Sequence, residues 1–221
     1  MGIALCFLPL IVAFIIFAAA FRLKISHLLI AVLLGLIAVL PISLIQYFIP
    51  DFSGLFSSPI LFSLLKSLII YGLIEEIFKT VLLLPLPHKN GLRDWLFLTF
   101  VTGLSLGCFE SVVYYFDHLQ IANSRGATLL YGQIAVRIFT ADLIHMTCTG
   151  ICGLFIYSCR NKIDGKGCRI SFLITAILLH GVYDFFAGFS GGLRWFSIAV
   201  VLMAIAESRI KYTALNCDNQ Q

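Results

Sequence analysis

The sequence predicts an all-α membrane protein, a polytopic bundle of about seven transmembrane helices. Three observations support this fold class. Hydrophobic residues make up 60% of the 221 residues and charged residues only 12%, a balance that soluble domains do not show. Apolar stretches of about 20 residues, long enough to cross a bilayer, recur along the whole chain. Because they leave no segment for a separate soluble domain, we expect a single transmembrane domain over residues 1–221.

The apolar stretches are separated by segments rich in proline, glycine and charged residues. They cover residues 3–21, 28–48, 60–84, 95–116, 128–159, 170–189 and 193–210. The expected breaks include IPDFSGLFSSP after the second stretch, DHLQIANSRG after the fourth and RNKIDGKGCR after the fifth. Trp95, Tyr114 and Trp195 lie near the ends of stretches, where aromatic rings favour the headgroup region.

The basic residues of the loops predict the orientation of the chain. One set of alternate loops carries Arg22, Lys24, Lys89, Arg93, Arg160, Lys162, Lys166, Arg169, Arg209 and Lys211. The other set carries Arg125 and Arg194. Since basic loops stay on the cytoplasmic side, we expect the N-terminus outside and the C-terminus in the cytoplasm. No basic patch with interleaved aromatic residues occurs in the sequence, so we expect the lipid bilayer and no nucleic acid as a partner.

The small residues and cysteines of the apolar stretches favour structural roles. Gly103 with Gly107, and Gly150 with Gly153, have the spacing that permits close helix packing. The seven cysteines are an odd number and lie mostly inside apolar stretches, so no disulfide framework is implied. We expect reduced thiols throughout.

Ionisable side chains inside the apolar stretches are the main functional signal. Such groups cost about 2.5 to 3.5 kcal/mol each at the membrane centre, and they commonly mark functional sites. The central stretches contain Lys66, Glu75, Glu76, Lys79, Glu110, Arg137, Asp142, His145, His180 and Asp184. At about 1.5 Å of rise per residue, the acids and histidines among them fall in one middle layer. We therefore expect the catalytic core in residues 60–190.

This set of residues predicts metal-assisted hydrolysis. Glu110, His145 and His180 can supply three ligands to a divalent metal ion such as zinc and leave a fourth position for water. A nearby carboxylate, for which we choose Glu76, can take a proton from that water and pass it to a leaving amine. The remaining acids that can orient a histidine or bind the ion themselves are Asp142 and Asp184.

Several alternatives stay open from the residues alone. Glu75 and Glu76 point about 100° apart on a helix, so one can face the site while the other pairs with a neighbouring helix or with Lys79. Glu75 and Lys79 can also form a purely structural ion pair. Glutamate and histidine can activate water without a metal. A proton- or ion-coupled transporter would use the same acids and histidines, and a haem protein could use His145 and His180 as axial ligands.

Four motifs in chain order resemble the PrsW family of intramembrane proteases, relatives of the CAAX prenyl endopeptidases. They are EEIFK from Glu75, GLSLGCFESVVYY from Gly103, HMTCTGICG from His145 and HGVYDFF from His180. The resemblance implies a membrane-embedded peptidase that cleaves a single-span membrane protein, as PrsW-like proteins do to a membrane-bound anti-sigma factor in bacteria. The site residues it implies are Glu75, Glu76, Glu110, His145 and His180, with Asp184 closing the last motif.

The resemblance also implies a multi-pass protein of a bacterial or archaeal plasma membrane. Two positions depart from the usual family pattern. Ser111 stands where the family usually has asparagine, and Leu106 stands where it usually has an aromatic residue. These departures affect the expected geometry of the site.

Overall fold

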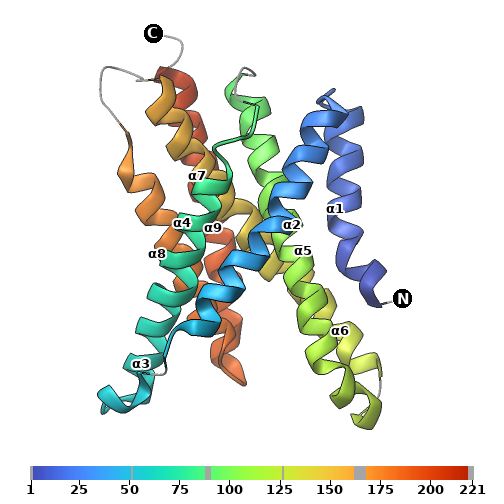
Figure 1. Ribbon diagram of the computed structural model, residues 1–221, viewed down its shortest axis with the longest axis vertical. Coiled ribbons are helices and arrows are strands. Elements are labelled where there is room, and N and C mark those ends of the chain that lie inside the picture. Colours follow the sequence, from blue (N-terminus) through green and yellow to red (C-terminus); the bar gives the residue numbers. More distant parts are fainter. Residues whose placement is uncertain (1, 51, 88–90, 126, 162–167, 219–221) are drawn as a thin grey trace.

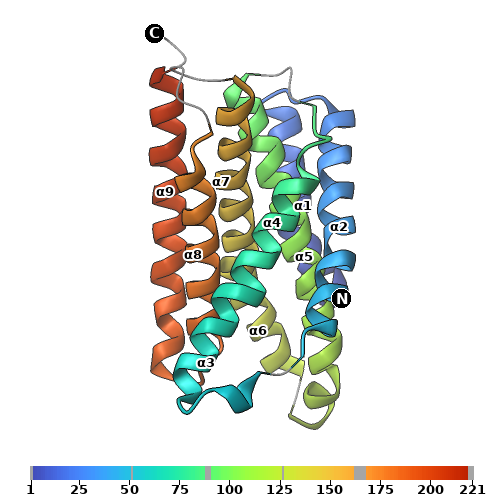
Figure 2. The same cartoon turned by 60° about the vertical axis from the view of Figure 1, so that its left-hand side comes forward.

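The computed structural model describes residues 2–50, 52–87, 91–125, 127–161 and 168–218, and its regular elements there are all helical (Figure 1). The chain begins with α1 (Gly2–Ala19), α2 (Ile25–Phe48) and the short turn η1 (Ser53–Leu55). One tilted rod follows, made of α3 (Pro59–Lys66), the π-helical segment η2 (Ser67–Leu73) and α4 (Ile74–Leu82) (Figure 2). The remaining elements are α5 (Leu92–Arg125), α6 (Ala127–Phe139), α7 (Ala141–Asn161), α8 (Ile170–Ala187), the turn η4 (Gly192–Trp195) and α9 (Phe196–Asp218).

These elements confirm the predicted all-helical class. Five segments of the described chain are long and apolar enough to cross a membrane: residues 2–19, 25–48, 92–119, 128–161 and 170–187. The other two predicted stretches are helical but are not among these five segments. The α3–η2–α4 rod carries Lys66, Glu75, Glu76 and Lys79, and α9 carries Glu207, Arg209 and Lys211. Seven spans and the orientation of the termini stay predictions. The basic residues Lys89, Lys162 and Lys166 lie outside the described residues.

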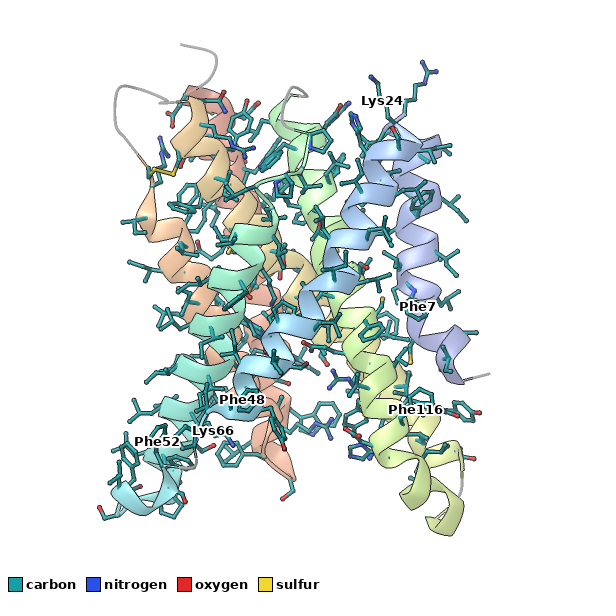
Figure 3. The ribbon with its side chains drawn as sticks, viewed as in Figure 1. Phe7, Lys24, Phe48, Phe52, Lys66 and Phe116 are labelled. Carbon is teal, nitrogen blue, oxygen red and sulfur yellow. A yellow bond between two sulfur atoms is a disulfide. The ribbon has the colours of Figure 1, made fainter. Side chains whose placement is uncertain are left out.

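The outside of the bundle is apolar and its polar side chains are turned inward. Phe48 and Phe116 are 72% and 54% exposed on the exterior (Figure 3). Glu76, Asp142 and His180, in contrast, are at most 1% exposed. This distribution is the reverse of that in a soluble protein, and it suits a bundle whose solvent is lipid.

Two helix boundaries differ from the predicted ones. α5 continues to Arg125, although the sequence predicts a loop from Asp117. With 34 residues at about 1.5 Å each it is longer than a hydrocarbon core of about 30 Å, so part of it extends beyond that layer. α6 packs beside this extension (Figure 1). This packing stabilises a helical conformation in a segment whose sequence is polar. The predicted 128–159 stretch is divided at Thr140 into α6 and α7.

Glycines allow α5 and α7 to cross closely at the centre of the bundle. A Cβ atom on Gly103 would lie 2.4 Å from the carbonyl oxygen of His145, and one on Gly153 would lie 2.5 Å from the Thr99 side chain. The Trp95 indole donates a 2.7 Å hydrogen bond to the carbonyl of Gly153 at the same crossing. The prediction that these glycines serve close packing is confirmed.

A second close crossing joins η2 to α8. A Cβ atom on Gly72 would lie 2.6 Å from the carbonyl oxygen of Ile177, and one on Gly181 would lie 2.7 Å from the Cα of Leu68. π-helical segments are rare and often lie at functional sites. Here the segment ends directly before α4, so this crossing sets the first turn of α4 against α8.

The expectation of reduced thiols is wrong for one pair. Cys159 and Cys168 form a disulfide between the end of α7 and the start of α8. Their Cα atoms lie 4.2 Å apart, because the packing of α7 against α8 brings the two helix ends together. Ser158 supports this approach by accepting a hydrogen bond from the backbone N–H of Arg169. The other described cysteines, Cys6, Cys108, Cys148, Cys152 and Cys217, are free thiols.

We expect the substitution Gly103→Ala to destabilise the bundle. The new methyl group has no room against the α7 backbone, and overpacking of this kind costs about 1 to 3 kcal/mol. The measurement is the thermal unfolding midpoint of the detergent-solubilised protein, which should fall. Gly132→Ala in α6 is the matched control, since a Cβ atom there would meet nothing within 4 Å. Equal midpoints for the two variants would contradict the close crossing.

Candidate functional site

Four helices place the predicted residues at one level of the bundle. α4 contributes Glu75, Glu76 and Lys79, α5 contributes Glu110, α7 contributes His145, and α8 contributes His180 and Asp184. Most of these side chains are buried, whereas those of Glu110 and Asp184 are 25% and 26% exposed. The two carboxylates therefore mark the open edge of the cluster.

Glu76 is completely buried, and both of its carboxylate oxygens have partners. Lys79 donates a 2.7 Å hydrogen bond to Oε1, and the Cys152 thiol donates to Oε2 at 3.3 Å. His180 Nδ1 lies 2.8 Å from the same Oε1, although this contact lacks the direction of a hydrogen bond. Glu76 is thus an internal anion that holds Lys79 and the ring of His180 in place.

The two oxygens of Glu75 have different contacts. Its Oε1 accepts a 2.9 Å hydrogen bond from the Gln46 amide. Its Oε2 lies 3.4 Å from the Lys79 ammonium but makes no hydrogen bond among the described residues, and neither does His180 Nε2, which lies 3.8 Å away. His145 Nδ1 lies 4.0 Å from the same oxygen. Buried polar atoms without a hydrogen bond are costly, so this arrangement indicates a position for a bound group between Glu75 and the two histidines.

The two histidines have similar relations to the carboxylates around them, although His145 Nδ1 also lies 3.0 Å from the Lys79 ammonium. Each turns one ring nitrogen toward Glu75 and the other toward a different carboxylate. For His145 that carboxylate is Glu110, at 2.8 Å from Nε2, and for His180 it is Glu76. A carboxylate behind an imidazole fixes the tautomer and the orientation of a histidine that binds a metal.

The donor atoms fit a divalent metal ion. Glu75, His145 and His180 each offer a ligand atom, and these atoms lie within 4.8 Å of one another. Two imidazoles with one carboxylate form a ligand set that catalytic zinc sites use. The described cluster also has an excess of negative charge, since one ammonium, that of Lys79, lies among four carboxylates: Glu75, Glu76, Glu110 and Asp184. A further cation would offset this excess in a region of low dielectric constant.

The two aspartates that the sequence grouped together have different surroundings. Asp184 Oδ2 lies 3.5 Å from His180 Nε2, so it belongs to the cluster. Asp142 accepts a 2.9 Å hydrogen bond from Ser111, which also accepts one from Arg137 at 3.3 Å. Within the described residues Asp142 makes no hydrogen bond or ion pair with His145, and its hydrogen bonds indicate a structural network between α5, α6 and α7.

Two contacts of the cluster were not anticipated from the sequence. Gln46 of α2 reaches Glu75, and Cys152 reaches Glu76. Gln46 is not among the ionisable residues of the apolar stretches, because its amide is neutral. An amide in an otherwise apolar stretch is a signal that could have found it.

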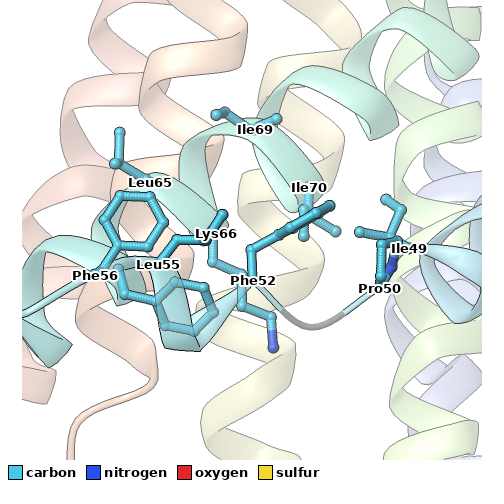
Figure 4. A pocket seen from close by; sticks show the side chains of 10 residues that line it. Ile49, Pro50, Phe52, Leu55, Phe56, Leu65, Lys66, Ile69 and Ile70 are labelled. Atoms are coloured by element: carbon cyan, nitrogen blue, oxygen red, sulfur yellow. The ribbon is translucent and has the colours of Figure 1, made fainter.

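An apolar pocket of about 420 Å³ lies between the end of α2, the turn η1 and the α3–η2 part of the rod (Figure 4). Its lining includes Phe52, Phe56, Leu65 and Ile69, with Lys66 among them. A neighbouring hollow of about 310 Å³ shares part of this lining and extends to Gln46, the hydrogen-bond donor to Glu75. The pocket therefore leads toward the cluster.

The comparisons with known proteins agree with the geometry. Residues 24–206 match the model of a family described as PrsW family intramembrane metalloprotease. No curated protein and no solved structure matches the chain. The matched segment contains every residue of the cluster described above.

We expect Lys79→Met to destabilise the protein strongly. Removing the ammonium leaves Glu75 and Glu76 as neighbouring buried carboxylates, and breaking a buried ion pair in this way costs about 3 to 5 kcal/mol. The double variant Glu76→Gln/Lys79→Met should recover part of the loss. Unfolding of the detergent-solubilised protein measures both changes. Lys66→Met is the control. If Lys79→Met were as stable as this control, the central role of the Lys79 ammonium would be contradicted.

Proposed function

Because the chain belongs to the PrsW family of intramembrane metalloproteases, we propose that Glu75, His145 and His180 hold a divalent metal ion for the hydrolysis of a peptide bond. The ligand set favours zinc. The observation that carries this assignment is a pair of buried atoms that make no hydrogen bond among the described residues, Glu75 Oε2 and His180 Nε2, which lie 3.8 Å apart. The chain is a multi-pass membrane protein, so the reaction takes place within or beside the bilayer.

The contacts assign the surrounding residues to positioning roles. A divalent ion bound here would supply Lewis-acid chemistry, lowering the pKa of water and polarising the scissile carbonyl. Glu110 orients His145 through Nε2, and Glu76 orients His180 through Nδ1. Lys79 lies 3.0 Å from His145 Nδ1 and would have to give up this contact for the nitrogen to bind a metal, a change that its flexible side chain would permit.

Proton transfer is best assigned to Asp184. The sequence suggested Glu76 for this role, but Glu76 is completely buried and both of its oxygens are engaged. Asp184 lies 3.5 Å from His180 Nε2 and is partly exposed, so water and substrate can reach it. In this assignment Asp184 takes the proton of the attacking water and delivers it to the leaving amine.

The substrate we propose is a single-span membrane protein, cleaved as in the regulated proteolysis of an anti-sigma factor. The apolar pocket beside Gln46 can hold apolar side chains of such a substrate near Glu75. We place the protein in a bacterial or archaeal plasma membrane, with its N-terminus outside. The distribution of basic residues in the sequence supports this orientation.

We expect Glu75→Gln and His180→Ala each to reduce cleavage of a co-expressed single-span membrane protein by at least about 100-fold, because each removes a ligand of the proposed site. Immunoblotting of the substrate fragments measures cleavage. Glu207→Gln, in an i,i+4 pair with Lys211 on α9, is the control and should cleave normally. Unchanged cleavage in both site variants would refute the assignment. Ion-driven uptake into liposomes, lost in the same variants without any cleavage, would favour a transporter.

Ile69→Trp should weaken substrate binding by filling the apolar pocket. We expect KM to rise several-fold while kcat stays within about twofold, because the change removes binding that the ground state and the transition state share. Steady-state cleavage kinetics in detergent measure both constants. Ile60→Trp, on the 64% exposed start of α3, is the matched control. A normal KM in Ile69→Trp would exclude the pocket from substrate recognition.

A further inference from the structure

A second pocket, of about 360 Å³, is lined in part by residues of the turn η4. The start of α9, directly after this turn, lies at the end of the bundle opposite the C-terminus (Figure 1). The pocket is bounded by the break between α6 and α7, the end of α8 and the start of α9. Two buried residues of its lining, Tyr183 and Thr140, are joined by a 3.1 Å hydrogen bond between their hydroxyl groups. We call it the arginine pocket, after Arg137 and Arg194 in its lining.

The lining of the arginine pocket carries positive charge without an acidic side chain among the described residues. Arg194 makes no hydrogen bond or ion pair through its side chain with any described residue. Arg137 stacks on the Tyr114 ring at 4.7 Å and donates through Nε to Ser111, which leaves its terminal N–H groups without a described partner. Two guanidinium groups at one pocket favour an anion with several oxygens, such as a phosphate.

The surroundings of the arginine pocket are apolar and point outward. Trp195, a lining residue at the end of η4, is 64% exposed. Phe139 and Phe196, which directly precede the lining residues Thr140 and Ser197, are 71% and 55% exposed. Tryptophan at a helix end is typical of the headgroup region of a membrane. A ligand with an anionic head and apolar tails fits this combination, because its head meets the arginines while its tails lie on the exposed apolar side chains.

We propose that the arginine pocket binds the phosphate of an anionic phospholipid. A lipid with net negative charge is preferred over a zwitterionic one, because a choline or ammonium group would add a third cation beside Arg137 and Arg194. An acidic segment of a polypeptide is less well matched, since the exposed apolar side chains around the pocket face the lipid. This proposal does not depend on the proteolytic activity.

Native mass spectrometry of the full-length protein in detergent tests the proposal. Phosphatidylglycerol and phosphatidylcholine with identical acyl chains are titrated separately. We expect the wild type to retain phosphatidylglycerol about tenfold better, and Arg194→Gln to lose this preference, since a charge-assisted contact of this kind is worth about tenfold in affinity. Arg194→Lys keeps the charge and should keep part of the preference.

The controls separate lipid binding from misfolding and from other anions. Arg22→Gln removes an exposed arginine at the opposite end of the bundle and should bind like the wild type. Equal retention of the two lipids by the wild type, or a normal preference in Arg194→Gln, would overturn the proposal. Displacement of phosphatidylglycerol by inorganic phosphate at equal concentration would also overturn the proposal. Arg194-dependent binding of an acidic transmembrane peptide, without any lipid preference, would assign the pocket to a polypeptide instead.

Discussion

The close approach of helix backbones at glycine is the constraint on which the site depends. Inside a membrane no hydrophobic effect drives helices together, so small residues that permit close packing carry much of the association. Gly103 on α5 lets α7 approach, and Gly72 with Gly181 lets the η2 segment approach α8. His145 and His180 reach Glu75 because these crossings leave no larger side chain between the helices.

Among the closely packed helices, the partners of the buried charged groups distinguish functional residues from structural ones. Two of the polar networks among the described residues are instructive, one around Lys79 and one that runs from Arg137 through Ser111 to Asp142. In the second network the Ser111 hydroxyl and the Asp142 carboxylate are both hydrogen-bonded, which is what a structural network requires. The Lys79 network instead leaves buried polar atoms of Glu75 and His180 without a hydrogen bond at one place. This difference, more than the presence of charge, separates a candidate active site from a buried ion pair.

The sequence predicted the fold class and the residues that share the central layer. Both follow from the length of the apolar stretches and from the positions of ionisable residues within them, which the sequence shows directly. It did not decide between Glu75 and Glu76. Adjacent residues point in different directions, and the choice depends on how the π-helical segment before α4 sets the rotation of that helix. The role of Gln46 was also missed, because a neutral amide becomes relevant only when a helix crossing places it against a carboxylate.

The most direct test of the account is the metal content of the purified full-length protein, measured by inductively coupled plasma mass spectrometry alongside cleavage activity. The account predicts about one divalent ion per chain in the wild type and in Glu207→Gln, and its loss in Glu75→Gln with the fold retained. An active preparation without stoichiometric metal, or a full complement of metal in Glu75→Gln, would contradict it.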